Sequence, residues 1–263
     1  MIIWLNGVLA DADRTRIDPA DRGLTLGDGL FETMMARDGR ILRLELHLER
    51  LRAGAAIIRL PLPQLPLPEM LTTTLEINKL NNAVLRLTIT RGIAGRGILP
   101  PEKVKPTVMV TTTPLPSELP PATCIVSAVT RRNEFSPLCR VKSLNYLDNI
   151  MARMEATDQG ADDALLLNTK GRAAESTVAN LFIVKCGEIH TPPLAEGALP
   201  GTVRSEVMQM LQVRETCLSV EDIINADEVF LTNSLGVRPV VKLDGHAINQ
   251  GSVASSLRSL FLI

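Results

Sequence analysis

The chain has 263 residues, of which 45% are hydrophobic and 22% are charged, and this composition excludes a disordered or collagen-like protein. Its 28 Lys and Arg residues balance 29 Asp and Glu residues, and the net charge is -1. This balance gives no electrostatic reason to expect nucleic acid or an anionic membrane as a partner. No run approaches the roughly 18 apolar residues of a membrane helix, and the first residues lack the basic region of a secretion signal.

The few cysteines and histidines argue against a metal site. The four cysteines are scattered without CxxC spacing, and none of the three histidines is paired at ligand spacing. Isolated, reduced thiols are typical of a cytoplasmic protein, so we expect a cytoplasmic enzyme with no bound metal.

The first part of the chain predicts hairpins followed by helices. Asn6-Gly7 and Asp38-Gly39 are turn pairs that favour tight hairpins. Apolar residues at helical spacing then follow from Glu45, and four prolines end that helix. The strands expected here are 2–5, 8–9, 30–36, 41–42, 84–90 and 107–113, and the helices are 45–58 and 70–80.

The segment 114–121, PLPSELPP, is the best candidate for a domain boundary because proline at four of eight positions favours an extended linker. We therefore expect an N-terminal domain over 1–113 and a C-terminal domain over 122–263. The strands expected in the second are 124–129, 164–167, 181–184, 228–231 and 237–243, with helices over 145–159 and directly after 201. Because strict strand–helix–strand alternation is missing, the order favours α+β domains over a doubly wound parallel sheet.

Lys142, in CRVKSLNYLDN, is the first residue that suggests chemistry. It follows a predicted strand and opens an apolar helix. A lysine at the edge of a core loses part of its hydration and becomes a neutral, nucleophilic amine. The alternative is a lysine that only lays its aliphatic stem along the core.

The run LPGTVR, residues 199–204, is a candidate anion site. Gly201 precedes a predicted helix, and free backbone N–H groups at a helix start bind phosphate. Asn233 and Ser234, at the end of a strand, could donate to the same anion. The alternatives are an ordinary helix start capped by Thr202 and a plain turn at 233–234.

Glu175 lies in the strand-like run RAAESTVANLF. A carboxylate among small and apolar residues is costly to bury unless it faces a cation or a donor, and a pyridinium nitrogen would satisfy it. The alternative is an exposed glutamate at a strand edge.

Two glycine-rich runs, DRGLTLGDG at 21–29 and TRGIAGRG at 90–97, lack the spacing of nucleotide-binding fingerprints. Their glycines indicate positive φ angles or a close approach of the backbone to another group.

Taken together, these segments resemble the class IV pyridoxal-phosphate aminotransferase family, which includes branched-chain and D-amino acid aminotransferases and aminodeoxychorismate lyase. The resemblance runs nearly from end to end. Its motifs, in order, are DRGLTLGDGLFET, HLERL, TRGIAGRG, VKSLNYLDN, ESTVANLF, LPGTVR and FLTNSLGVRPV. It implies the two-domain fold type IV of pyridoxal-phosphate enzymes, with the cofactor near the interface of the domains and of a homodimer.

The resemblance also implies roles for individual residues. Lys142 would form the Schiff base with pyridoxal 5'-phosphate and carry protons, and Glu175 would keep the pyridine nitrogen protonated. Arg50, in HLERL, would bind the phosphate. The remaining contacts implied for the cofactor are the backbone at Gly201, Thr202 and Val203, the side chains of Asn233 and Ser234, and Tyr146 near the phenolic oxygen.

The residues expected near the substrate favour a resemblance to aminodeoxychorismate lyase. This enzyme makes 4-aminobenzoate and pyruvate from 4-amino-4-deoxychorismate for folate synthesis. TRGIAGRG resembles the lyase segment, and Arg96 is the residue expected to bind a substrate carboxylate. D-amino acid aminotransferases usually carry a histidine where Ile98 stands and a tyrosine where Phe31 stands. Against this, the lyases commonly carry an aromatic residue at the position of Ile98. The alternative is a class IV aminotransferase for D-amino acids or branched-chain substrates.

Overall fold

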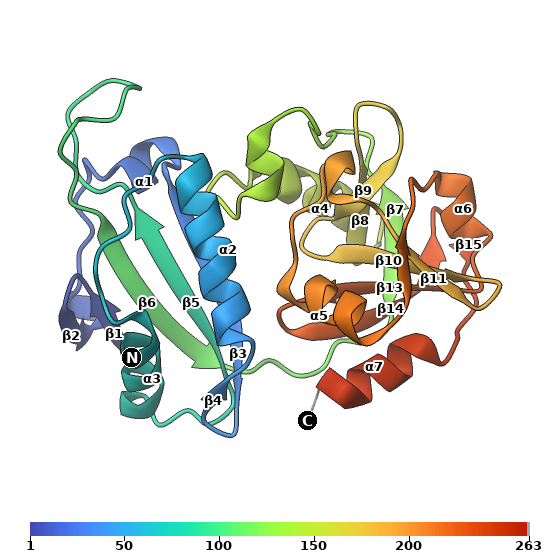
Figure 1. Ribbon diagram of the computed structural model, residues 1–263, viewed down its shortest axis with the longest axis horizontal. Coiled ribbons are helices and arrows are strands. Elements are labelled where there is room, and N and C mark those ends of the chain that lie inside the picture. The colour runs from blue at the N-terminus through green and yellow to red at the C-terminus, as the bar shows by residue number, and fades with distance from the viewer. Residues whose placement is uncertain (262–263) are drawn as a thin grey trace. The chain divides into compact units, whose positions relative to one another are not determined.

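The computed structural model describes residues 1–261, and their contacts divide the chain into two compact units (Figure 1). The first unit contains Met1–Ser117 and Val141–Asn145, and the second contains Glu118–Arg140 and the chain from Tyr146 onward. The boundary at 117/118 falls inside the proline-rich run, whose residues 115–121 have no regular structure.

The first unit is built on a six-stranded antiparallel sheet with strand order β2-β1-β6-β5-β3-β4. Both predicted turn pairs form its hairpins, and all four of their residues have the positive φ angles that such turns require. The strands are β1 (Ile2–Leu5), β2 (Val8–Asp11), β3 (Gly29–Arg37), β4 (Arg40–Ile41), β5 (Ala83–Thr90) and β6 (Thr107–Pro114).

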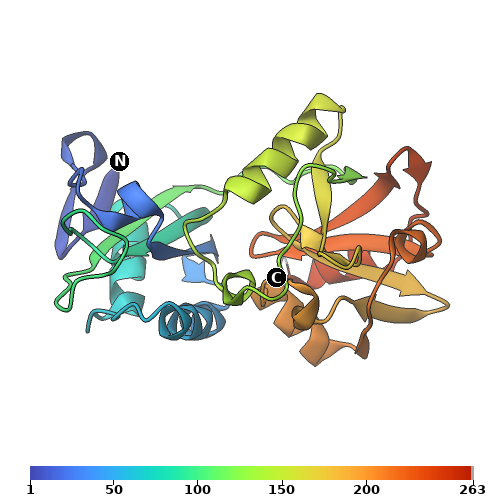
Figure 2. The same ribbon diagram turned by 90° about the horizontal axis from the view of Figure 1, so that it is seen from above.

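Two helices cover one face of this sheet, α2 (Leu44–Ile57) and α3 (Leu67–Ile77), as Figures 1 and 2 both show. Their buried residues recur at helical spacing, for example Leu48 and Leu51 on α2 and Leu71 and Leu75 on α3, and they form one core with the sheet. The expected helices are therefore confirmed. The short elements η1 (Ala12–Arg14) and α1 (Arg22–Leu26) were not predicted.

The second unit holds a nine-stranded mixed sheet that closes on itself. Its main path is β12-β11-β10-β13-β14-β7-β8-β9, and a further pairing of β9 with β10 closes six of these strands into a ring. The strands are β7 (Ala122–Val126), β8 (Asp163–Leu167), β9 (Ala173–Ser176), β10 (Asn180–Lys185), β11 (Glu188–Thr191), β12 (Val213–Glu215), β13 (Glu228–Asn233), β14 (Gly236–Leu243) and β15 (His246–Ala247).

Side chains on opposite faces of β10 and β13 pack into two separate hydrophobic cores. Leu181 and Leu231 belong to one apolar cluster, whereas Phe182 and Phe230 stack with ring centroids 5.0 Å apart in another cluster, formed with the helices. The helices are α4 (Leu147–Asp158), α5 (Thr202–Met210), α6 (Val220–Ile224) and α7 (Val253–Phe261), with the short turns η2 (Pro137–Arg140) and η3 (Leu194–Glu196). The mixture of hairpins, parallel pairs and helices confirms the α+β prediction.

Two local expectations around Lys142 are wrong. The helix expected over 145–159 forms as α4, but Lys142 does not open it, because the residue lies five positions before the helix start. Its segment, Val141–Asn145, belongs by its contacts to the first unit, although we expected Lys142 in the C-terminal domain. The strand expected over 124–129 ends at Val126.

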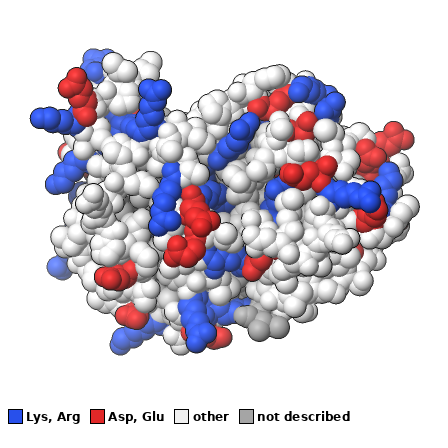
Figure 3. All heavy atoms as spheres, in the orientation of Figure 1, with Lys and Arg blue, Asp and Glu red and all other residues white. Residues whose placement is uncertain are grey.

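Charged side chains of both signs are interspersed on the face shown in Figure 3, in keeping with the near-zero net charge. Over the described residues, no helix has both the length and the apolar character needed to cross a membrane. The cysteines are all free thiols, with Cys124 and Cys139 buried and Cys186 and Cys217 exposed.

Candidate active site

Backbone hydrogen bonds to β3 fix the position of Lys142. The N–H of Phe31 donates to the carbonyl of Lys142 at 3.0 Å, and the N–H of Leu144 donates to the carbonyl of Gly29 at 3.0 Å. The short strand β4 pairs with β3 at Ala36 and Arg37, near the end of β3. The same edge of β3 is therefore free at its first residues, where Leu30 pairs with Ser143 of the Lys142 segment. Lys142 is thus held on a sheet edge, where its backbone has little freedom to move.

The structure brings Phe31 and Lys142 together. The Lys142 ammonium nitrogen Nζ lies 4.4 Å from the centroid of the Phe31 ring, and the central guanidinium carbon of Arg86 lies 3.8 Å from the same centroid. The ring itself is buried. Cations over an aromatic face are attracted by its quadrupole, so the ring orients the lysine without donating a hydrogen bond.

Arg50 lies in a buried charged cluster with Glu32 and His47. Its Nε and Nη2 atoms donate to the two carboxylate oxygens of Glu32 at 2.9 and 2.5 Å. His47 Nδ1 lies 2.6 Å from the same carboxylate, and because a carboxylate only accepts, this nitrogen carries the hydrogen. The spacing of HLERL places His47 and Arg50 on one face of α2, and β3 supplies Glu32 opposite them. Sequence reasoning selected Arg50 alone and missed the two residues that orient it.

The protonation of this cluster follows from its burial. Burial acts to raise the pKa of Glu32, but hydrogen bonds from Arg50 and His47 outweigh it and hold the pKa below its ordinary value of 4.5. Burial also lowers the pKa of His47 below its ordinary value of 6.5, despite the neighbouring carboxylate. At neutral pH the cluster therefore consists of a carboxylate, a neutral imidazole and a guanidinium.

Acidification from pH 7 to pH 5 should weaken the folded protein through His47. The unfolded chain takes up a proton on this imidazole near pH 6.5 and the folded chain only at a lower pH, so stability present above pH 6.5 is lost as pH falls. We expect the urea midpoint to drop between these pH values, and to drop less in His47→Gln, whose amide keeps a donor toward Glu32. His246→Gln, at an exposed histidine, is the control and should keep the full drop. An unchanged pH dependence in His47→Gln would contradict this assignment.

Arg96 lies in the loop between β5 and β6, and its side chain is exposed. The other predicted substrate residue, Phe31, is a buried residue of β3 in the same unit. No described contact within this unit joins the two, so the role of Arg96 toward a substrate stays a prediction.

Glu175 is a buried residue of β9, not an exposed one at a strand edge. Its two carboxylate oxygens meet the Leu199 N–H at 2.9 Å and the Arg132 guanidinium at 3.0 Å. Both partners stabilise the negative charge, so this site holds a carboxylate in its ionised form. Arg132 was missed because RRNEF, residues 131–135, carries no periodic or motif signal; the guanidinium is aimed by a further bond from Nε to the Gly197 carbonyl at 3.0 Å.

The predicted helix after LPG is α5, and Gly201 is its N-cap, with no side-chain cap hydrogen bond. Thr202 is the first residue of the helix, so the alternative in which it caps the helix is wrong. A Cβ atom at Gly201 would lie 1.9 Å from the Asn180 carboxamide oxygen, and therefore only glycine allows the helix start to approach β10 so closely. The Val203 side chain is buried in the core beneath α5, which leaves only its backbone for an anion contact.

The remaining predicted residues also belong to the second unit. Asn233 ends β13 and Ser234 begins the turn to β14, and the Asn233 carboxamide oxygen accepts from the Leu235 N–H at 2.9 Å. Tyr146, half-buried, directly precedes α4. Their contacts with a cofactor stay predictions.

Comparison with known proteins identifies the family. Residues 29–243 match the model of the amino-transferase class IV family. A Methanocaldococcus jannaschii protein proposed to be a branched-chain-amino-acid aminotransferase is 35% identical, over 99% of this chain and 94% of its own length. The T.th. branched-chain amino acid aminotransferase, solved with pyridoxamine 5'-phosphate, has a TM-score of 0.93 at 28% identity, covering 99% of this chain and 92% of that one.

A Legionella pneumophila protein proposed to be 4-amino-4-deoxychorismate lyase has a TM-score of 0.87 at 30% identity, covering 95% of this chain and 96% of that one. The likeness extends to proteins named for both activities. The chain therefore belongs to the class IV aminotransferase family of pyridoxal-phosphate-dependent enzymes.

Proposed function

We propose that the protein is an aminodeoxychorismate lyase of folate synthesis, which converts 4-amino-4-deoxychorismate to 4-aminobenzoate and pyruvate. The observation that carries this proposal is the buried Phe31 ring, 4.4 Å from the Lys142 ammonium. A phenyl ring offers a flat apolar wall to a cyclohexadiene ring that becomes aromatic, and it cannot hydrogen-bond an amino acid carboxylate.

The residues present fit pyridoxal phosphate. Glu175 is a buried carboxylate kept ionised by Arg132 and the Leu199 N–H, as a partner for a protonated pyridine nitrogen requires. The start of α5 has a glycine N-cap with no side-chain cap bond, which suits a phosphate. We propose that Arg50, the backbone of residues 201–203, and the side chains of Asn233 and Ser234 hold the phosphate. Tyr146 is proposed to contact the phenolic oxygen.

When bound, the cofactor supplies an electron sink for the substrate amine. Lys142 would hold the cofactor covalently and would take the proton from C4 of the substrate ring. The C–O bond to the enolpyruvyl group then breaks, and Lys142 returns a proton to the departing group, which leaves as pyruvate. Atoms balance without water or a keto acid, and formation of the aromatic ring makes the elimination downhill.

Arg96 is proposed to bind a carboxylate of the substrate through its planar guanidinium. Its exposure in the β5–β6 loop leaves its donors accessible to a ligand.

An aminotransferase acting on branched-chain or D-amino acids is the second candidate. Its support is the 35% identity to the Methanocaldococcus jannaschii protein. Such an enzyme would use the same lysine and glutamate but would need an amino acceptor to complete each turnover.

The deciding experiment gives the cofactor-loaded enzyme 4-amino-4-deoxychorismate without any keto acid. Equimolar 4-aminobenzoate and pyruvate over many turnovers is the expected result. No product, together with a change in cofactor absorbance on adding D- or branched-chain amino acids, would replace the lyase with the second candidate. No response to any of these amines would reject both.

We further propose that the protein is a homodimer that works in the cytoplasm, where its four free cysteines remain reduced. Helix α4 supports the dimer, because Ala152 and Ala156 face the core while an apolar stripe on its opposite side is exposed. The stripe consists of Leu147, Ile150, Met151 and Met154.

A charge in this stripe should weaken the dimer. In Met151→Lys, burying the new ammonium between two copies would be costly, so we expect sedimentation velocity to show dissociation at a protein concentration about tenfold or more higher. Ile77→Lys, at an exposed apolar residue of α3, is the control and should sediment like the unaltered protein. Equal behaviour of the two variants would place the interface elsewhere.

A further inference from the structure

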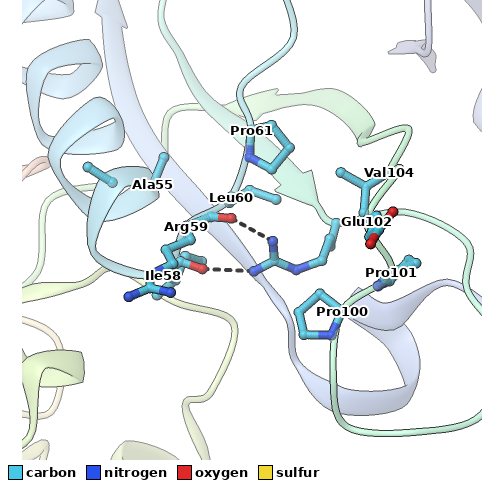
Figure 4. Close-up of a pocket in the computed structure, with 11 residues that line it drawn as sticks. Ala55, Ile58, Arg59, Leu60, Pro61, Pro100, Pro101, Glu102 and Val104 are labelled. Carbon is cyan, nitrogen blue, oxygen red and sulfur yellow. Dashed lines mark hydrogen bonds between the residues drawn. The ribbon is translucent and has the colours of Figure 1, made fainter.

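The 91–106 loop, which carries Arg96, has little hydrophobic support. The tip residues Ile98 and Leu99 are 86% and 87% exposed, so burial of apolar side chains does not hold the tip in place. A pocket of about 740 Å³ lies between residues 100–104 of the loop and the end of α2. Figure 4 shows Pro100 and Pro101 across this pocket from Ile58 and Arg59. Polar contacts must therefore supply much of the support for this loop.

Asp21 supplies such contacts at both ends of the loop. Its carboxylate oxygen Oδ2 accepts from the hydroxyl groups of Thr90 at 2.9 Å and Thr107 at 2.7 Å, directly before and after the loop. The close approach depends on glycine: a Cβ at Gly23 would lie 2.2 Å from the Thr90 side chain, and one at Gly92 would lie 2.0 Å from the Lys105 carbonyl oxygen. These contacts explain glycines that the sequence left without a role.

Arg22, the next residue, holds the tip. Its Nη1 and Nη2 atoms donate to the carbonyls of Gly97 at 2.9 Å and Ile98 at 2.6 Å, directly after Arg96. Its Nε donates to Asp28 at 2.8 Å, and the Arg22 side chain is 5% exposed. Each of its three nitrogen atoms therefore has an acceptor in a fixed, planar arrangement.

Asp28 connects this support to β3 and α2. The same oxygen that receives Arg22 also accepts from Arg91 Nε at 2.7 Å, and Asp28 directly precedes β3, the strand of Phe31. Arg91 donates in turn to the carbonyls of Ile58 and Arg59 at the end of α2, the two bonds drawn in Figure 4. Arg91 is thus a structural residue.

We propose that Arg22 is a positioning residue for substrate recognition: by fixing the carbonyls of residues 97 and 98, it holds Arg96 where the substrate carboxylate is bound. The inference rests on the proposed role of Arg96. Arg22 itself touches neither substrate nor cofactor, and it acts only through the loop.

The test uses the cofactor-loaded Arg22→Lys variant, which keeps a positive charge but cannot serve Asp28 and both carbonyls at once. We expect amide hydrogen exchange over residues 94–104 to become about tenfold faster or more, with exchange in β13 unchanged. We also expect KM for 4-amino-4-deoxychorismate to rise about tenfold at nearly constant kcat and unchanged cofactor affinity. In the Arg96→Ala background, the same substitution should raise KM no further.

The matched control is Arg16→Lys, because Arg16 is an exposed arginine of the same unit that also donates to two backbone carbonyls, those of Asp13 and Thr15. It should leave loop exchange and KM unchanged. If Arg22→Lys fails to fold, Thr107→Val removes one bond to Asp21, and both loop exchange and KM should then rise; faster exchange at an unchanged KM would overturn the inference.

Loop exchange that does not change in Arg22→Lys would overturn the inference, whatever the enzyme's substrate. A KM rise that persists in the Arg96→Ala background would overturn the claim that Arg22 acts through Arg96. An unaltered KM in Arg96→Ala alone would instead reject the proposed substrate role of Arg96, and with it the positioning role of Arg22. Failure of the unaltered enzyme to use aminodeoxychorismate would reject only the lyase, because KM can then be measured with an amino acid.

Discussion

Replacement of Lys142 by alanine should reduce turnover by about 10³-fold or more, because the side chain is proposed both to bind the cofactor and to move protons. The fold should survive the substitution. The hydrogen bonds that fix this segment to β3 join backbone atoms of Phe31, Leu144, Gly29 and residue 142 itself, and alanine retains them all. The contact of the ammonium with the Phe31 ring, worth about 1 kcal/mol, is lost.

The measurement combines single-turnover kinetics with borohydride reduction of the loaded enzyme. Reduction should attach the cofactor permanently to the peptide that contains Lys142, and mass spectrometry should find no such peptide in Lys142→Ala. Lys185→Ala is the control, since that exposed lysine pairs with Asp222 at the surface. A reduced cofactor found on another lysine would contradict the assignment.

Replacement of Glu175 by glutamine should lower kcat by about 10²-fold, because the amide cannot hold a proton on the pyridine nitrogen. A hydrogen bond to a charged group contributes up to about 3 kcal/mol, and each 1.4 kcal/mol corresponds to a factor of ten in rate. Cofactor affinity should fall less than kcat, since the phosphate contacts are proposed to come from other residues.

A matched control exists in the same unit. Glu196 is also buried and paired with an arginine, Arg172 at 3.2 Å, and it accepts from the Asn168 amide at 2.6 Å. Glu196→Gln should therefore reproduce any general loss of stability, measured by the urea midpoint, without the loss of kcat. Equal losses of kcat in both variants would show that Glu175 only stabilises the fold.

Local patterns predicted most elements because each is specified by nearby residues. Asn6-Gly7 and Asp38-Gly39 require positive φ angles whatever surrounds them, and the apolar spacing of 45–58 gives one helix face. The closure of the second sheet could not be predicted in this way. It depends on parallel pairs of β7 with β14 and β8, which join segments far apart in the chain, as well as on the local pairing of Asn180 with Glu175.

The same distinction between local patterns and contacts with distant segments applies to the candidate site. The family motifs selected Lys142, Glu175 and Arg50, but the partners that orient them come from other elements: Phe31 from β3, Arg132 from a loop, and Glu32 from the strand opposite α2. Lys142 was placed at a helix start because the helical pattern begins nearby. No sequence pattern indicates that the short β4 leaves part of the β3 edge free to pair with the Lys142 segment.

The interleaving of the two units in the chain has a practical consequence for building chimeric enzymes. The first unit is interrupted, since Val141–Asn145 returns to it after a stretch that belongs to the second. A fragment ending at the proline-rich run would leave the edge of β3 uncovered and would lack the lysine. Exchange of the first unit between relatives therefore requires two grafts, residues 1–117 and the five-residue segment, transferred together.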